Sequence, residues 1–383
     1  MDDGYSFEGA LLAYIALVVM ALVPIYIGSW ASLDSSLLDD EEQISTSEAL
    51  LFPVFGSISL FSLYLLLNYL DPSLVNLVLT GLFITVSSSS LFLMILRISL
   101  KCFDFNTDTY HFKLTEGAND ILDFKFAYVH LGSIFLTMIF SVLYVYTKNW
   151  LLSNIYALSY ACLAIELIKL DSYKTGSILL MGLFAYDVFW VFGSAAVSGG
   201  SSVMEVVATG LDLPIKVLFP RNVFLYNPYE LLFIQDKFAL LGLGDIVVPG
   251  IFISLCLKFD MQQKLNKYPY FSVCMIAYFV GLITTIVVMH VFKAGQPALL
   301  YLSPACILST SICGILRHEF QLLINFNCDV EKPSTLNEQT PIKKVEGNVS
   351  DLRELIAKPT TPSRKSKPLQ VSPMTMKLRE RKK

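Results

Sequence analysis

Long apolar segments run through most of the chain and constrain its fold more than any other feature. A helix rises 1.5 Å per residue, so about 20 apolar residues are needed to cross the roughly 30 Å hydrocarbon core of a membrane. Nine segments have this length and composition: 10–30, 49–70, 74–96, 127–147, 150–168, 176–197, 238–257, 270–292 and 297–316. Charged residues make up 16% of the chain, whereas soluble domains carry about 25%. The hydrocarbon core offers no water to pair with backbone N–H and C=O groups, so a spanning segment must pair them internally, as a helix does. The sequence therefore predicts an all-α, polytopic membrane protein with nine transmembrane helices.

The basic residues indicate how these helices are oriented. Residues 1–9 contain no Lys or Arg, so the first segment lacks the basic flank of a cleavable signal peptide and is expected to span the membrane with its N-terminus outside the cytosol. Nine spans then place the C-terminus in the cytosol. In this orientation the short cytosolic loops hold nine Lys and Arg and the opposite loops hold five, as the positive-inside rule requires.

The predicted spans divide the chain into three parts. Residues 1–125 hold the first three spans, residues 126–320 hold spans four to nine with the loop 198–237, and residues 321–383 form a tail. Pro, Ser, Thr and Lys dominate the tail, which is therefore predicted to be largely disordered. The loop begins with Gly and Ser and continues with apolar residues, and both a gate and a plain interfacial connector fit it.

Two aspartates lie within predicted spans. Asp187 is in the middle of the sixth span and Asp245 is in the seventh, and neither has a basic residue within one helical turn. A central Asp costs about 2.5–3.5 kcal/mol on the insertion scale, so such residues usually serve a function. Taken separately, each Asp fits a structural polar contact or an ion site as well as it fits catalysis.

The two aspartates together favour acid–base chemistry. Two carboxylates held close on neighbouring helices cannot both ionise, so they share one proton near neutral pH. One can then activate a water molecule while the other donates a proton to a carbonyl oxygen. This chemistry requires no metal or other cofactor, and the four histidines, at positions 111, 130, 290 and 318, lack ligand spacing. The net charge of −4 gives no sign of nucleic-acid binding.

Glycines and prolines accompany the aspartates. Gly242 and Gly244 precede Asp245, where they allow another backbone to approach or the helix to loosen, although plain helix packing explains them equally well. Pro249 weakens the same helix because it lacks an N–H donor. The ninth span begins at Pro297, and a proline at a helix start is ordinary.

The motifs Tyr186-Asp187, Gly242-Leu243-Gly244-Asp245 and Pro297-Ala298-Leu299, in this order on spans six, seven and nine, resemble those of the presenilin/signal peptide peptidase family of GxGD aspartic proteases. The resemblance is strong over residues 125–320. It implies a presenilin-like fold of nine spans in the membrane of the endoplasmic reticulum. It also implies hydrolysis of transmembrane peptides, notably remnant signal peptides and type II membrane peptides, and it leaves room for a homo-oligomer.

The resemblance also implies roles for individual residues. Asp187 and Asp245 would form the catalytic pair, with Tyr186 beside them. The other residues would shape the active site and substrate groove: Gly242, Leu243, Gly244, Pro297, Ala298 and Leu299. The family's di-lysine retrieval signal has no counterpart, because Glu380 and Arg381 stand at its positions.

Two other functions remain compatible with the sequence. A proton- or cation-coupled transporter would use the same two carboxylates, although no second copy of the Gly-x-Gly-Asp segment indicates the internal repeat common in transporters. A non-catalytic chaperone or degradation adaptor would bind membrane proteins without needing either Asp.

Overall fold

The computed structural model describes residues 7–33, 43–102, 110–116, 119–126, 128–194, 203, 216–221, 223, 238–292 and 296–328. All of them belong to one compact unit, Met1–Glu331. The predictions for most of the 198–237 loop and of the tail lie outside these residues. At its start the tail contains the short helix α12 (Phe320–Ile324).

The described chain is mostly helical, as predicted. Eight described helical segments are long and apolar enough to cross a membrane. They correspond to α1 (Phe7–Ala31), α2 (Thr46–Tyr69), α3 (Pro72–Cys102), α4 (Tyr128–Thr147), α5 (Trp150–Leu167), α6 (Tyr173–Val188) with the π-helical turn η1 (Phe189–Gly193), α10 (Pro269–Phe292) and α11 (Leu299–Leu316). Local capping sets where several begin: the Ser172 hydroxyl, for example, accepts from the Thr175 N–H at the start of α6.

The prediction of one continuous helix over 238–257 is wrong. Its first five residues form the strand β6 (Phe238–Gly242), and the helix α9 (Gly244–Gln262) follows. β6 pairs antiparallel with β5 (Lys216–Pro220), with Leu218 opposite Leu240 and Lys216 opposite Gly242. A five-residue apolar strand joined directly to an apolar helix has the composition of a single span, so periodicity does not separate the two.

Two further small sheets lie at other points of the chain. β1 (Gln43–Ile44) runs parallel to β4 (Lys169–Leu170). β2 (Tyr110–Glu116) pairs antiparallel with β3 (Asn119–Phe126) between α3 and α4. Neither was predicted.

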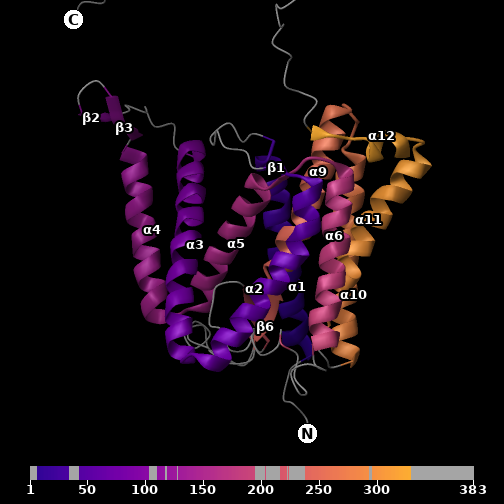
Figure 1. Ribbon diagram of the computed structural model, residues 1–383, viewed down its shortest axis with the longest axis horizontal. Coiled ribbons are helices and arrows are strands. Elements are labelled where there is room, and N and C mark those ends of the chain that lie inside the picture. The colour runs from indigo at the N-terminus through magenta and orange to yellow at the C-terminus, as the bar shows by residue number, and fades with distance from the viewer. Residues whose placement is uncertain are drawn as a thin grey trace, which may run out of the picture. The chain divides into compact units, whose positions relative to one another are not determined.

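Helix α9 lies at the centre of the bundle, in contact with α1, α5, α6, α10 and α11 (Figure 1). Most of its residues are buried, from Ile246 to Asp260. By contrast, α2 is largely exposed. Ala49 is its one buried residue, and the helix packs mainly against α6. The large exposed apolar side chains of α2, such as Phe52 and Phe55, suit contact with hydrocarbon.

One ion pair ties the peripheral helices to this core. Arg97 of α3 donates to both carboxylate oxygens of Glu166 on α5, at 2.5 and 2.6 Å. Glu166 is buried, and a paired, bidentate geometry is what makes a charge tolerable there.

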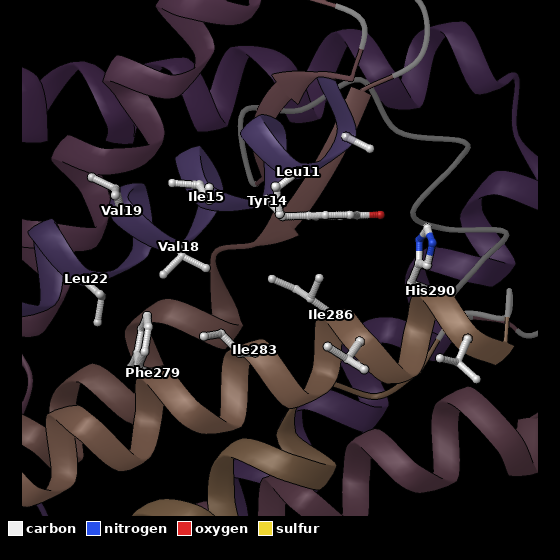
Figure 2. A pocket seen from close by; sticks show the side chains of 13 residues that line it. Leu11, Tyr14, Ile15, Val18, Val19, Leu22, Phe279, Ile283, Ile286 and His290 are labelled. Carbon is white, nitrogen blue, oxygen red and sulfur yellow. The ribbon is translucent and has the colours of Figure 1, made fainter. Parts of the chain in front are cut away.

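An apolar groove of about 520 Å³ lies between α1 and α10. Val18, Leu22, Phe279 and Ile283 line it at one end, and Tyr14 and His290 lie at the other (Figure 2). The rings of Tyr14 and His290 meet edge to face, with centroids 6.4 Å apart. Neither predicted catalytic Asp lines this groove.

Candidate active site

Asp187 lies in the last turn of α6, and its side chain is held by the start of another helix. The residue is buried, 5% exposed. Its Oδ2 accepts a hydrogen bond from the backbone N–H of Leu299 at 3.1 Å. Leu299 is the first residue of α11, where N–H groups have no partner within their own helix. A helix N-terminus favours a negative charge, so this contact stabilises the ionised form of Asp187.

Asp245 lies at the beginning of its helix, as the second residue of α9. Strand β6 ends at Gly242, and Leu243 alone separates the strand from α9. Asp245 is held through its backbone: its carbonyl oxygen accepts from the hydroxyl of Tyr278 on α10, at 3.1 Å. The strand-to-helix junction therefore places this carboxylate at a helix N-terminus.

Packing of α6 against both α9 and α11 brings the predicted site together. Asp187, near the C-terminal end of α6, and Asp245, at the start of α9, lie on two helices that pack against one another. Leu299, from the predicted Pro297-Ala298-Leu299 motif, contacts Asp187 directly, while Pro297 is buried and Ala298 half-buried beside it. Segments far apart in the sequence thus meet at one place.

The two glycines before Asp245 have different surroundings. A Cβ atom on Gly242 would lie 3.3 Å from Asp245 Oδ2 and 3.9 Å from its Cγ, so any side chain there crowds the carboxylate. A Cβ on Gly244 would meet nothing within 4 Å beyond its own helix and chain neighbours. Gly242 therefore makes room for the carboxylate itself, whereas Gly244 borders open space. Leu243, between them, is buried.

Tyr186, the predicted neighbour of the pair, packs toward α2. Its ring atom Cε2 would lie 3.4 Å from a Cβ on Gly56. Its ring centroid is 6.4 Å from that of Trp190, whose Nε1 donates to Ser57 Oγ of α2 at 3.0 Å. This aromatic pair attaches the Asp187 end of α6 to α2.

The β5–β6 hairpin leads into the site, and one side chain of α5 holds it. Asn154, 5% exposed, donates to the Leu218 carbonyl at 2.7 Å and accepts from the Leu218 N–H at 2.8 Å. The backbone groups of Leu218 therefore point away from β6. Because antiparallel pairs alternate, the backbone groups of Leu240, opposite Leu218, point away from β5. The Leu240 side chain is 57% exposed.

Asn154 and Tyr278 were not among the residues predicted from the sequence. An Asn in an apolar span is a recognisable polar signal, but its partner on a strand is not predictable from one sequence. Tyr278 carries no local signal. Within the described part of the chain, no group of three or more His, Cys, Asp or Glu is arranged to hold a metal ion.

Comparisons with known proteins find similar chains over most of the sequence. A family model described as Signal peptide peptidase matches residues 36–329. The chain is 35% identical over 353 residues to the signal peptide peptidase of Mus musculus, covering 90% of each chain. It is 38% identical over 310 residues to that of Homo sapiens, covering 78% of this chain and 79% of the human one. A solved structure of a presenilin family intramembrane aspartate protease aligns with 79% of this chain and 96% of its own, with a TM-score of 0.44 and 14% identity.

The family match covers most of the helical bundle, including α6, α9 and α11, which carry the predicted site. The murine relative extends the similarity to nine-tenths of the chain. The chain therefore belongs to the signal peptide peptidase family of intramembrane aspartic proteases.

Proposed function

We propose that Asp187 and Asp245 hydrolyse peptide bonds within transmembrane segments, with remnant signal peptides and type II membrane peptides as substrates. One observation carries the proposal: the N–H of Leu299 binds the buried Asp187 carboxylate on α6, which packs against α9, the helix that begins beside Asp245. The substrate class rests on the relatives, which bear the name signal peptide peptidase.

We infer different roles for the two carboxylates from their surroundings. The Leu299 N–H and the N-terminus of α11 stabilise a negative charge on Asp187, so the shared proton resides on Asp245. Asp187 takes a proton from water, and the water oxygen bonds to the scissile carbonyl carbon as Asp245 gives its proton to the carbonyl oxygen. Asp187 then gives its proton to the amide nitrogen as the C–N bond breaks. Asp245 recovers its proton from a hydroxyl of the tetrahedral intermediate, which leaves a carboxylic acid.

Strand addition provides a way to expose the bond to be cut. A peptide bond within a helix is shielded by the helix's own hydrogen bonds, so a substrate must unwind locally. The backbone groups of Leu240 face away from β5, and among the described strands β6 pairs with β5. An unwound substrate strand that pairs along this edge is led toward Gly242, beside the Asp245 carboxylate.

The proposed location is the endoplasmic reticulum membrane, with the N-terminus luminal and the C-terminus cytosolic. The eight described helical segments that are long and apolar enough to cross a membrane support a multi-pass protein, and the excess of Lys and Arg in alternate loops supports the orientation. Substrates would then enter from the membrane itself, and a homo-oligomer remains compatible with the arrangement.

Mass spectrometry of the products of a synthetic signal peptide tests this function. Asp187→Asn and Asp245→Asn keep the side-chain size but remove the acid–base groups, so each is expected to lower the cleavage rate by at least about a thousandfold. Asp71→Asn is the matched control. Asp71 Oδ1 accepts from Ser73 in the turn before α3, and Asn also caps helices well. Cleavage by either active-site variant at the rate of Asp71→Asn would overturn the proposal.

A further inference from the structure

Pro249 leaves a gap in the hydrogen-bond ladder of α9. In an α-helix the carbonyl of residue 245 accepts from the N–H of residue 249, and Pro249 has no N–H. The carbonyl that loses its partner is therefore that of Asp245. A backbone carbonyl without a partner in a buried region is costly, so another donor is required.

Tyr278 provides that donor from the neighbouring helix. Its hydroxyl donates to the Asp245 carbonyl at 3.1 Å, and the residue is completely buried in α10. Helices α9 and α10 pack against one another, which fixes the position of the hydroxyl. The contact thus occupies the acceptor that Pro249 leaves unused.

The first turn of α9 is packed in the core through Leu243 and Ile246 but has few other hydrogen-bond restraints. Leu243 at its N-cap makes no side-chain capping hydrogen bond, and its carbonyl accepts from Ile246 and Val247 at 3.1 and 2.8 Å. Gly244 adds no side-chain contact. The direction of the Asp245 side chain is set by this turn, so it depends on what holds the Asp245 backbone.

We propose that Tyr278 is a positioning residue, which replaces the hydrogen bond lost at Pro249 and so keeps the Asp245 carboxylate directed at the scissile bond. The inference rests on the proposed function of the Asp187–Asp245 pair. Tyr278 acts through the Asp245 backbone and takes no part in proton transfer. Loss of the Tyr278 hydroxyl therefore alters the geometry of the chemical step more than it alters the binding of the peptide.

A double-mutant experiment separates this role from a general loss of stability. Tyr278→Phe removes the hydroxyl and keeps the ring, so kcat is expected to fall roughly tenfold to a hundredfold with KM nearly unchanged. Pro249→Ala restores an N–H within reach of the Asp245 carbonyl. The Tyr278→Phe/Pro249→Ala protein is therefore expected to recover most of the lost kcat.

Tyr270→Phe is the matched control. Tyr270 is also completely buried in α10, and its hydroxyl donates to Glu319 at 2.9 Å, away from Asp245. Its removal is expected to lower thermal stability but leave the kcat of the folded enzyme unchanged. An equal loss of kcat in Tyr270→Phe and Tyr278→Phe would overturn the inference.

Two further outcomes also decide the matter. If folded Tyr278→Phe cleaves at the wild-type rate, or if Pro249→Ala fails to restore the folded double variant, Tyr278 does not position Asp245 in this way. Asp245→Asn, measured in the same assay, separates this failure from failure of the proposed function. An active Asp245→Asn overturns the function, whereas an inactive Asp245→Asn beside a fully active Tyr278→Phe overturns the inference alone.

Discussion

The surroundings of Asp187 and Asp245 differ in how each aspartate is held. Asp187 sits at the end of α6, and its carboxylate itself accepts a hydrogen bond from Leu299 of α11. Asp245 sits at the start of α9, and its main-chain carbonyl accepts from Tyr278 of α10. One residue is fixed at its carboxylate and the other at its backbone. Two residues of the same type can therefore occupy different surroundings. The contact at Asp187 stabilises the charge of its carboxylate, whereas the contact at Asp245 fixes the position of its backbone.

Substitution of the glycines before Asp245 is expected to give the largest effect, and it tests how the Asp245 carboxylate is positioned. Gly242→Ala places a Cβ 3.3 Å from Asp245 Oδ2, so the carboxylate must shift, and kcat is expected to fall about a hundredfold. Gly244→Ala adds the same methyl group where nothing lies within 4 Å. Its kcat should stay close to wild type, with any effect appearing in KM. Steady-state kinetics on a fluorogenic peptide would measure both, and equal losses of kcat would contradict the distinction between the two glycines.

Substitution of Asn154 tests whether the β5–β6 hairpin, which leads to Asp245, contributes to catalysis. Asn154→Ala removes both hydrogen bonds to Leu218, which costs ~1–3 kcal/mol and loosens β5 and, through it, β6. The expected result is a loss of about tenfold in kcat/KM. Ser159→Ala is the control, because Ser159 lies on the same helix and its hydroxyl donates to the Ile155 carbonyl. Unchanged kinetics of Asn154→Ala would show that the hairpin does not position substrate.

Glu319 gives the smallest expected effect. It lies at the N-cap of α12 and accepts from Tyr270 at the start of α10, whereas Tyr278 contacts Asp245 further along that helix. The Arg317 guanidinium, which donates from Nε at 2.9 Å, lowers the pKa of Glu319 below its ordinary value of 4.5. A lowered folded-state pKa contributes stability above pH 4.5, and this stability is lost as the pH falls through the folded-state pKa. Glu319→Gln should therefore lower the melting temperature slightly at pH 7, with the difference shrinking below pH 4.5. Cleavage by the folded variant should be unchanged, and a slowed cleavage would show that this end of α10 is coupled to the site.

Much of the fold was predictable because membrane helices are long and uniformly apolar. The bounds of α5 and α10 differ from the predicted spans 150–168 and 270–292 by a single residue at one end. The same uniformity concealed β6, since its five apolar residues continue without a break toward α9. Gly242 and Gly244 marked the junction, but the sequence does not distinguish a loosened helix from a strand that ends.

The candidate site was predictable in its residue types but not in its contacts. Two Asp residues without cations are conspicuous in apolar spans, and the motif order linked them to Leu299. That the Leu299 backbone, rather than its side chain, binds Asp187 depends on where α11 begins. The contribution of Tyr278 depends on the packing of two helices, which a single sequence does not reveal.

The contact between Leu299 and Asp187 also has a consequence for biosynthesis. The two residues are 112 positions apart, and the donor belongs to the last long helix in the part of the chain that the structure describes. A ribosome that adds 5–20 residues per second needs roughly 6–22 s to extend the chain from one to the other. During this interval α6 is complete but Asp187 lacks its donor. The hydrogen bond that holds the Asp187 carboxylate therefore forms only after α11 has been synthesised, late in the assembly of the described helices.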